Sequence, residues 1–110
     1  MRARPSTGRR GRRFTLELPL ETPDGFGGVV RTYQPGPQLW GAMELLSGSE
    51  RFRAGREEGL ATHRLTFPFR DGVTAAMQLT LGVRRFRITH AGDPDGRRRA
   101  LVCLVEEFGP

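Results

Sequence analysis

The sequence contains no lysine, only one cysteine and two histidines, and no long apolar run. A chain without lysine cannot provide the lysine of a phosphate-binding P-loop. Cys103 cannot form an internal disulfide and has no second cysteine for a metal or redox pair. His63 and His90 lie too far apart to form a recognisable metal-ligand spacing. No segment has the length of a membrane-spanning helix. We therefore expect no metal, no cofactor and no membrane association.

Positive charge is concentrated at the N-terminus. All 18 basic residues are arginines, against 12 acidic residues in the whole chain. The first thirteen residues contain no acid and six of the arginines, namely Arg2, Arg4, Arg9, Arg10, Arg12 and Arg13. Residues 14–110 then balance 12 arginines against 12 acids. This predicts a flexible basic arm over residues 1–13 and a single neutral domain over residues 14–110. Such an arm suits nucleic acid or an acidic protein surface, or it is a solubilising tail that orders on assembly.

Residues 12–18 have some features of an export signal. "RRFTLEL" is similar at first sight to a twin-arginine signal. Such a signal needs a continuous apolar stretch next, and Glu17, Pro19 and Glu21 interrupt it. There is no small-residue cleavage site either. We expect a protein that stays in the cytoplasm.

The hydrophobic pattern predicts an all-β domain. Glycine (15) and proline (8) make up more than a fifth of the chain, which favours turns and short strands. Apolar residues alternate with polar ones, as expected for half-buried strands. The expected strands cover residues 14–20, 29–34, 38–46, 60–69, 75–81, 82–91 and 100–108. Residues 38–46 are apolar on both faces, so a short helix there stays open. We predict a small antiparallel β-barrel or sandwich of six or seven short strands.

Three glycines stand close together in "DGFGGVV", and such clusters also occur in phosphate-binding loops. A dinucleotide fingerprint would require glycine at position 30, where Val30 stands. Strands also flank this loop, whereas the phosphate site needs a helix N-terminus. The preceding Pro-Asp-Gly is a strong turn signal. We therefore assign a hairpin turn to Gly25, Gly27 and Gly28.

The remaining reactive side chains have structural interpretations. Cys103 alternates with Val102 and Leu104 in a core strand, so it is read as a small hydrophobic residue. His63 shares the apolar face of its strand, and nothing local supports a Cys-His dyad. Adjacent Glu106 and Glu107 point to opposite faces of a strand. Most phenylalanines fall on inward positions, which leaves Trp40 and Tyr33 as the expected exposed aromatic residues. No enzyme activity is indicated.

The order of segments resembles the phage head–tail joining proteins, also called head closure or stopper proteins. The similar segments are residues 12–19 (RRFTLELP), 22–28 (TPDGFGG), 39–50 (LWGAMELLSGSE), 62–79 (THRLTFPFRDGVTAAMQL) and 84–107 (RRFRITHAGDPDGRRRALVCLVEE). Phe69 stands where that family often has tyrosine, and Gly41 interrupts its tryptophan-alanine pair. The resemblance covers nearly the whole predicted domain and implies the same fold.

The resemblance implies a structural protein at the neck of a tailed phage, a prophage particle or a gene transfer agent. Its copies would form a ring below the portal and adaptor rings and above the tail terminator or tail tube. The ring would close the channel that holds packaged double-stranded DNA and would dock the tail. Assembly would take place in the bacterial cytoplasm. The rival interpretation is a small basic OB-like or SH3-like barrel that binds nucleic acid.

Three groups of residues are candidate contact sites in such a ring. The arm arginines would contact DNA or an acidic adaptor surface. The polar loop 47–59 mixes both charges and would pair with neighbouring subunits, gate the channel or simply be a surface loop; its charged residues are Glu50, Arg51, Arg53, Arg56, Glu57 and Glu58. The hairpin tip would contact the next ring through Asp24, Gly25, Phe26, Gly27 and Gly28.

Overall fold

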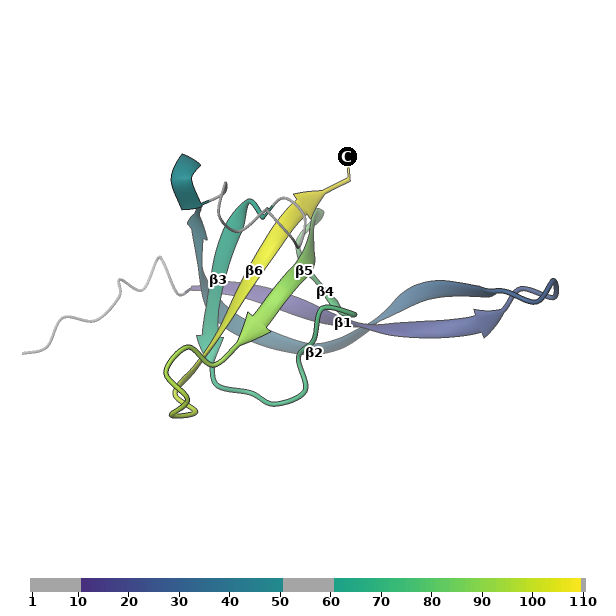
Figure 1. Cartoon of the computed structure of the whole chain (residues 1–110), viewed down its shortest axis with the longest axis horizontal. Coiled ribbons are helices and arrows are strands. Elements are labelled where there is room, and N and C mark those ends of the chain that lie inside the picture. The colour runs from purple at the N-terminus through teal and green to yellow at the C-terminus, as the bar shows by residue number, and fades with distance from the viewer. Residues whose placement is uncertain (1–10, 51–60, 110) are drawn as a thin grey trace, which may run out of the picture.

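The computed structural model describes residues 11–50 and 61–109. Within these ranges the protein is built from six strands, as Figure 1 shows. They are β1 (Arg12–Pro23), β2 (Val29–Leu45), β3 (His63–Pro68), β4 (Gln78–Leu81), β5 (Arg84–Gly92) and β6 (Ala100–Phe108). The all-β prediction is confirmed. Residues 1–10 of the predicted arm and 51–60 of the predicted loop lie outside the described residues.

The strands close into an antiparallel barrel in the order β1-β2-β3-β6-β5-β4. The barrel closes where β1 pairs with β4, through Thr15 opposite Thr80 and Leu16 opposite Leu79. The register of β1 on β2 shifts between Thr15 and Glu17, which marks a bulge in the strand that serves both neighbours. Closure leaves the barrel itself without an open sheet edge.

The barrel interior is filled by alternate residues of all six strands, as period-two patterning requires. Phe14 is fully buried and its ring packs edge-on against Phe67 and Phe86, with centroids 5.5 and 6.0 Å apart. The core consists of Phe14, Leu16, Leu39, Leu65, Phe67, Leu79, Phe86, Ile88, Leu101, Cys103 and Val105. The expected alternation of inward apolar residues is therefore confirmed, for example at Leu65, Phe86 and Ile88.

Two of the predicted strands are in fact one. The sequence indicated a break at Pro35 and Pro37, but β2 runs without interruption from Val29 to Leu45. Up to Gly41, β2 pairs with β1 alone, because β3 joins it only from Ala42 onward. A proline in an edge strand loses no ladder bond when its nitrogen faces outward. The prediction of uniformly short strands is wrong for β1 and β2, and the alternative of a helix over 38–46 is excluded.

Two smaller predictions of strand position need correction. Val83 was expected to begin a strand, but it lies in the turn between β4 and β5 and is 90% exposed. The preceding strand was expected from residue 75, but residues 75–76 form a turn and β4 starts at Gln78. Gly82 has φ of +61°, a conformation that glycine adopts freely. Residues 82 and 83 therefore form the turn, and β5 begins at Arg84.

The close packing around Gly41 explains why glycine stands here in place of the alanine of the tryptophan-alanine pattern. A Cβ atom at this position would lie 2.5 Å from the Phe67 ring and 2.6 Å from the carbonyl oxygen of Thr66. The absence of a side chain therefore lets β2 approach β3 closely and lets Phe67 fill the barrel interior.

Candidate functional site

The first two strands extend far beyond the barrel as a two-stranded ribbon (Figure 1). β1 pairs with β4 only from Thr15 to Glu17, so beyond Leu18 it pairs with β2 alone. We call residues 18–23 and 29–34 the ribbon, and residues 24–28 its tip. Six residues of strand rise about 20 Å, which is the length by which the ribbon projects. An isolated two-stranded hairpin is marginally stable in water.

The two faces of the ribbon differ in charge. One face continues the inward side of β1 and carries Leu18, Leu20, Thr22, Val30, Thr32 and Gln34, none of them charged. On the other face Glu21 lies opposite Arg31, and the Arg31 Nη2 and Nε atoms donate to Glu21 Oε2 at 2.6 and 3.0 Å. The single pair of opposite charges on this face neutralises itself. The ribbon therefore offers neutral surface on both sides.

The tip is an Asp-anchored turn. Oδ1 of Asp24 accepts hydrogen bonds from the backbone N–H groups of Phe26 and Gly28, at 2.7 and 3.0 Å. These amides hold the pKa of Asp24 below its ordinary value, with the Phe26 amide the larger cause. Gly25 and Gly27 have φ of +86° and +89°, which residues with a side chain rarely adopt. The predicted turn is confirmed, and the glycines serve backbone conformation.

Exposed apolar side chains are concentrated on the ribbon and its tip. Among the described residues, the exposed large hydrophobic side chains are Leu20, Phe26, Val29, Val30, Trp40, Leu45 and Val83, and the first four belong to this region. Phe26 is 93% exposed. Of the two aromatic residues expected to be exposed, Trp40 is 55% exposed and Tyr33 is partly buried. Phe26 was expected at the hairpin tip but not among the exposed aromatic residues. The signal for Phe26 was its place between two turn glycines, where no strand face can bury it.

The β1 edge of the ribbon is a poor template for another strand. Pro19 and Pro23 interrupt the outer edge of β1 within the ribbon, whereas the β2 prolines, Pro35 and Pro37, follow the ribbon residues 29–34. Proline has no N–H to donate to an added strand, and natural proteins use it to protect edges. Strand addition along the β1 side of the ribbon is therefore disfavoured, whereas the faces and the tip of the ribbon are accessible.

At the opposite side of the molecule, the start of the polar loop is tied to the barrel. Arg64 on β3 donates from Nη2 to Glu50 Oε2 at 2.8 Å and from Nη1 to Glu44 Oε1 at 3.1 Å. Glu50 Oε1 also accepts from the Ser47 amide at 2.9 Å. Arg64, first, and then Ser47 lower the pKa of Glu50 to about 2. Glu50 is thus a fixed anchor of the loop; Arg51, Arg53, Arg56, Glu57 and Glu58 lie outside the described residues.

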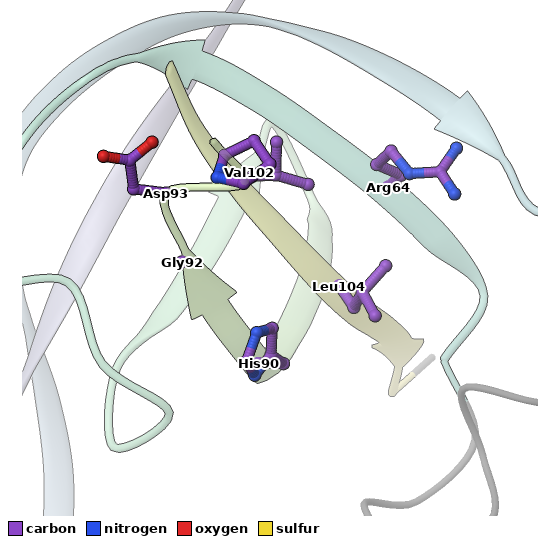
Figure 2. A pocket seen from close by; sticks show the side chains of 7 residues that line it. Arg64, His90, Gly92, Asp93, Val102 and Leu104 are labelled. Carbon is purple, nitrogen blue, oxygen red and sulfur yellow. The ribbon is translucent and has the colours of Figure 1, made fainter. Parts of the chain in front are cut away.

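A shallow groove of about 270 Å³ crosses the outer surface of β3, β5 and β6 (Figure 2). Val102 and Leu104 form its apolar floor, and His90 borders it. The Arg64 guanidinium points away from the floor, toward its two glutamates. Asp93 accepts the amides of Gly96 and Arg98 and so belongs to the neighbouring turn. The charged groups at the rim are thus committed to local structure.

The other reactive side chains also have structural partners. Cys103 is fully buried, and burial raises the pKa of its thiol to about 12. His63 is buried, its Nδ1 atom lies 2.9 Å from Thr62 Oγ1, and its ring packs edge-on against Phe86. The core interpretation of Cys103 and His63 is confirmed. In residues 11–50 and 61–109 no cluster of three potential metal-ligating side chains occurs, and no helix there is long and apolar enough to cross a membrane.

Comparison with known proteins agrees with this architecture. The model of one family, described as phage head completion protein, matches residues 5–107, which include the ribbon and nearly all of the barrel. The chain belongs to the phage head completion protein family. No curated protein matches the sequence.

Two solved structures share the fold of this head completion protein. The solution structure of protein SF1141 from Shigella flexneri 2a is 26% identical with a TM-score of 0.72, and the match covers 91% of this chain and 94% of that one. A chain from the virion of a native gene transfer agent particle is 27% identical with a TM-score of 0.67, over 88% of this chain and 94% of that one. This head completion protein is therefore a structural protein of a phage or phage-like particle.

All the predicted tip residues lie in the described part of the chain, whereas the arm and loop groups lie there only in part. The tip residues lie together at the far end of the ribbon. Arg12 and Arg13, assigned to the arm, are the first residues of β1, whereas Arg2, Arg4, Arg9 and Arg10 precede the described chain. Arg12 and Arg13 lie at the start of β1 and the tip follows its end, so these two predicted sites lie at opposite ends of β1 in the head completion protein (Figure 1).

Proposed function

We propose that this head completion protein forms a ring in the neck of a phage-like particle, between the portal and adaptor rings and the tail terminator or tail tube. The ring closes the channel that retains packaged DNA and presents the surface on which the tail docks. The observation that carries the proposal is the ribbon, a neutral, uncovered extension of a compact barrel in a family of head completion proteins. Such an extension gains stability only when another surface covers it.

The charge distribution of the barrel supports close packing of many copies. Residues 14–110 are neutral overall, so copies do not repel each other. Many of the arginines in the described barrel are already paired or stacked: Arg84 is bidentate to Glu107 at 2.8 and 2.9 Å, and Arg98 pairs with Asp71 at 3.1 Å. Arg85 and Arg87 lie over the Phe108 ring. These contacts disfavour the rival nucleic-acid-binding barrel, which needs a free basic face.

The proposal includes the basic arm and the polar loop. The arm contacts packaged DNA or an acidic adaptor surface, and the loop 47–59 pairs with neighbouring copies or enters the channel. No catalytic reaction is assigned to the chain. Assembly takes place in the bacterial cytoplasm, and the mature location is the particle neck.

Imaging of intact particles tests the proposal. A particle imaged with this chain labelled should show it as a ring between portal and tail, and a strain lacking it should yield heads that lose DNA and carry no tails. Its location in the baseplate or the capsid shell would overturn the proposal.

Two deletions separate the contributions of arm and loop. Loss of residues 1–11 that leaves assembly intact but releases DNA would assign the arm to DNA, and failure to join heads would assign it to the adaptor. Deletion of residues 49–58 should impair ring assembly or DNA retention. If both stay normal, the loop is only a surface loop.

A further inference from the structure

β1 connects two ends of the molecule that carry opposite charge (Figure 1). At its start, Arg12 and Arg13 are exposed, and the preceding segment adds four more arginines and no acid. At the other end, Asp24 is the one charged residue between positions 22 and 30. Its Oδ2 atom takes part in no hydrogen bond within the described chain, since Oδ1 accepts both turn amides. The tip thus carries one acidic side chain, and the start of β1 carries two exposed arginines.

Each of these ends also exposes an aromatic ring. Phe26 projects from the tip and is 93% exposed. Trp40 is 55% exposed and lies directly opposite Arg13 in the β1–β2 register, with the Arg13 guanidinium 5.4 Å from the ring centroid. Arg13 forms no ion pair with any described residue. We call Arg13 and Trp40 the basic end. Aromatic rings and arginine are the residue types that dominate protein–protein contacts.

The two ends cannot meet within one chain. Ten residue steps separate Arg13 from Pro23 along β1, which corresponds to about 33 Å of strand. Any contact between the tip and the basic end must therefore form between two molecules. A contact between two different surfaces of identical subunits is heterologous, and it generates a ring when the rotation closes.

We propose that the tip of one copy docks on the basic end of the next, with Phe26 packed against Trp40 and Asp24 paired with Arg13. This inference rests on the ring of the proposed function and specifies the contact between neighbouring copies in that ring. Charge complementarity favours a second copy of this chain as the partner, because the tip carries Asp24 and Arg13 at the basic end has no acidic partner among the described residues. Pro19 and Pro23 disfavour strand addition along the β1 edge, which directs contacts on that side to the faces and the tip.

Disulfide trapping tests this contact in assembled particles. The chain carrying both Phe26→Cys and Trp40→Cys should give a ladder of cross-linked multimers on a non-reducing gel after mild oxidation. Both positions are exposed, so the substitutions leave the core untouched. The native Cys103 does not interfere, because it is fully buried and its thiol pKa is raised to about 12.

Matched variants show whether the ladder of cross-linked multimers arises from the contact between the tip and the basic end. Val83→Cys with Trp40→Cys places one cysteine at an equally exposed apolar position outside the contact, and it should give no ladder. A mixture of the two single variants, Phe26→Cys and Trp40→Cys, should stop at dimers, because each copy then carries only one engineered cysteine. Dimers from Phe26→Cys alone would indicate tip-to-tip pairing and overturn the proposal.

The outcomes also separate this inference from the proposed function. If the double variant is present in necks of normal, tailed particles but gives no ladder, or cross-links to another neck protein, the contact is wrong and the proposed function stands. If wild-type chain is absent from the neck, the proposed function fails first. A charge test adds an independent measurement: Asp24→Asn keeps the oxygen that accepts the turn amides, so it should weaken trapping without disturbing the tip, and unchanged trapping would remove Asp24 from the contact.

Discussion

Phe14 and Leu20 are six residues apart on β1, yet Phe14 is fully buried and Leu20 is 45% exposed. The difference lies in what surrounds the strand. Around Phe14, β1 is part of a closed barrel and the side chain points into a shared core. Around Leu20, β1 pairs with β2 alone among the described strands, and the side chain is largely open to solvent. The barrel is stabilised by its own packing, whereas the ribbon has no comparable core within the described residues.

The sharpest test of this contrast truncates one phenylalanine in each region. Phe86→Ala removes a fully buried ring that contacts Phe14 and His63, and we expect it to lower the free energy of unfolding by about 3–5 kcal/mol. Phe26→Ala at the exposed tip should change it by less than about 0.5 kcal/mol. Urea denaturation of both variants measures the difference. Similar losses for the two would mean that the tip is packed in solution.

A second test fills the close contact between β2 and β3. Gly41→Ala places a Cβ atom 2.5 Å from the Phe67 ring, so we expect a loss of about 1–3 kcal/mol by urea denaturation. Gly48→Ala is the matched control, because nothing lies within 4 Å of its added Cβ. Equal stability of both variants would show that the barrel relaxes around position 41.

A third test addresses the ribbon alone. Asp24→Ala removes the acceptor for two tip amides, so the ribbon should fray while the barrel persists. Hydrogen exchange should quicken at residues 25–32, with the amides of β3 and β6 unchanged. Faster exchange throughout the molecule would indicate that ribbon and barrel unfold as one unit.

The smallest expected effect concerns pH and the anchor of the polar loop. The pKa of Glu50 is lowered from 4.5 to about 2, so the folded state favours its ionised form. That stabilisation is present above pH 4.5 and is lost as the pH falls toward 2. In thermal melts, wild type should lose more stability over this interval than Glu50→Gln. Parallel pH profiles would show that the Glu50–Arg64 pair contributes nothing.

Local patterns predicted the barrel well because its strands are half-buried. Alternation identified the inward positions of Phe14, Leu65 and Phe86, and Pro-Asp-Gly located the hairpin turn. Prediction failed where neighbours decide the outcome. From the sequence alone, Pro35 and Pro37 predict a break in the strand. They are compatible with β2 because no described strand other than β1 pairs with β2 before Ala42, where β3 begins to pair.

For the contact surfaces, the sequence identified residue types but not their relation. The sequence places six of the 18 arginines in the first thirteen residues and predicts a turn at Gly25, Gly27 and Gly28. It could not show that β1 carries Arg13 and the tip to opposite ends, because that depends on strand length and pairing. Phe26 was expected at the tip but not listed among the exposed aromatic residues, since phenylalanine is usually buried.

The sequence by itself determined the all-β class, the turn at Asp24 and the neutral domain behind a basic start, because each depends on local chemistry or composition. The tertiary structure alone decided that β1 and β2 outgrow the barrel and leave a ribbon uncovered. Burial is a property of neighbours, and a strand's pattern does not say how many neighbours it has.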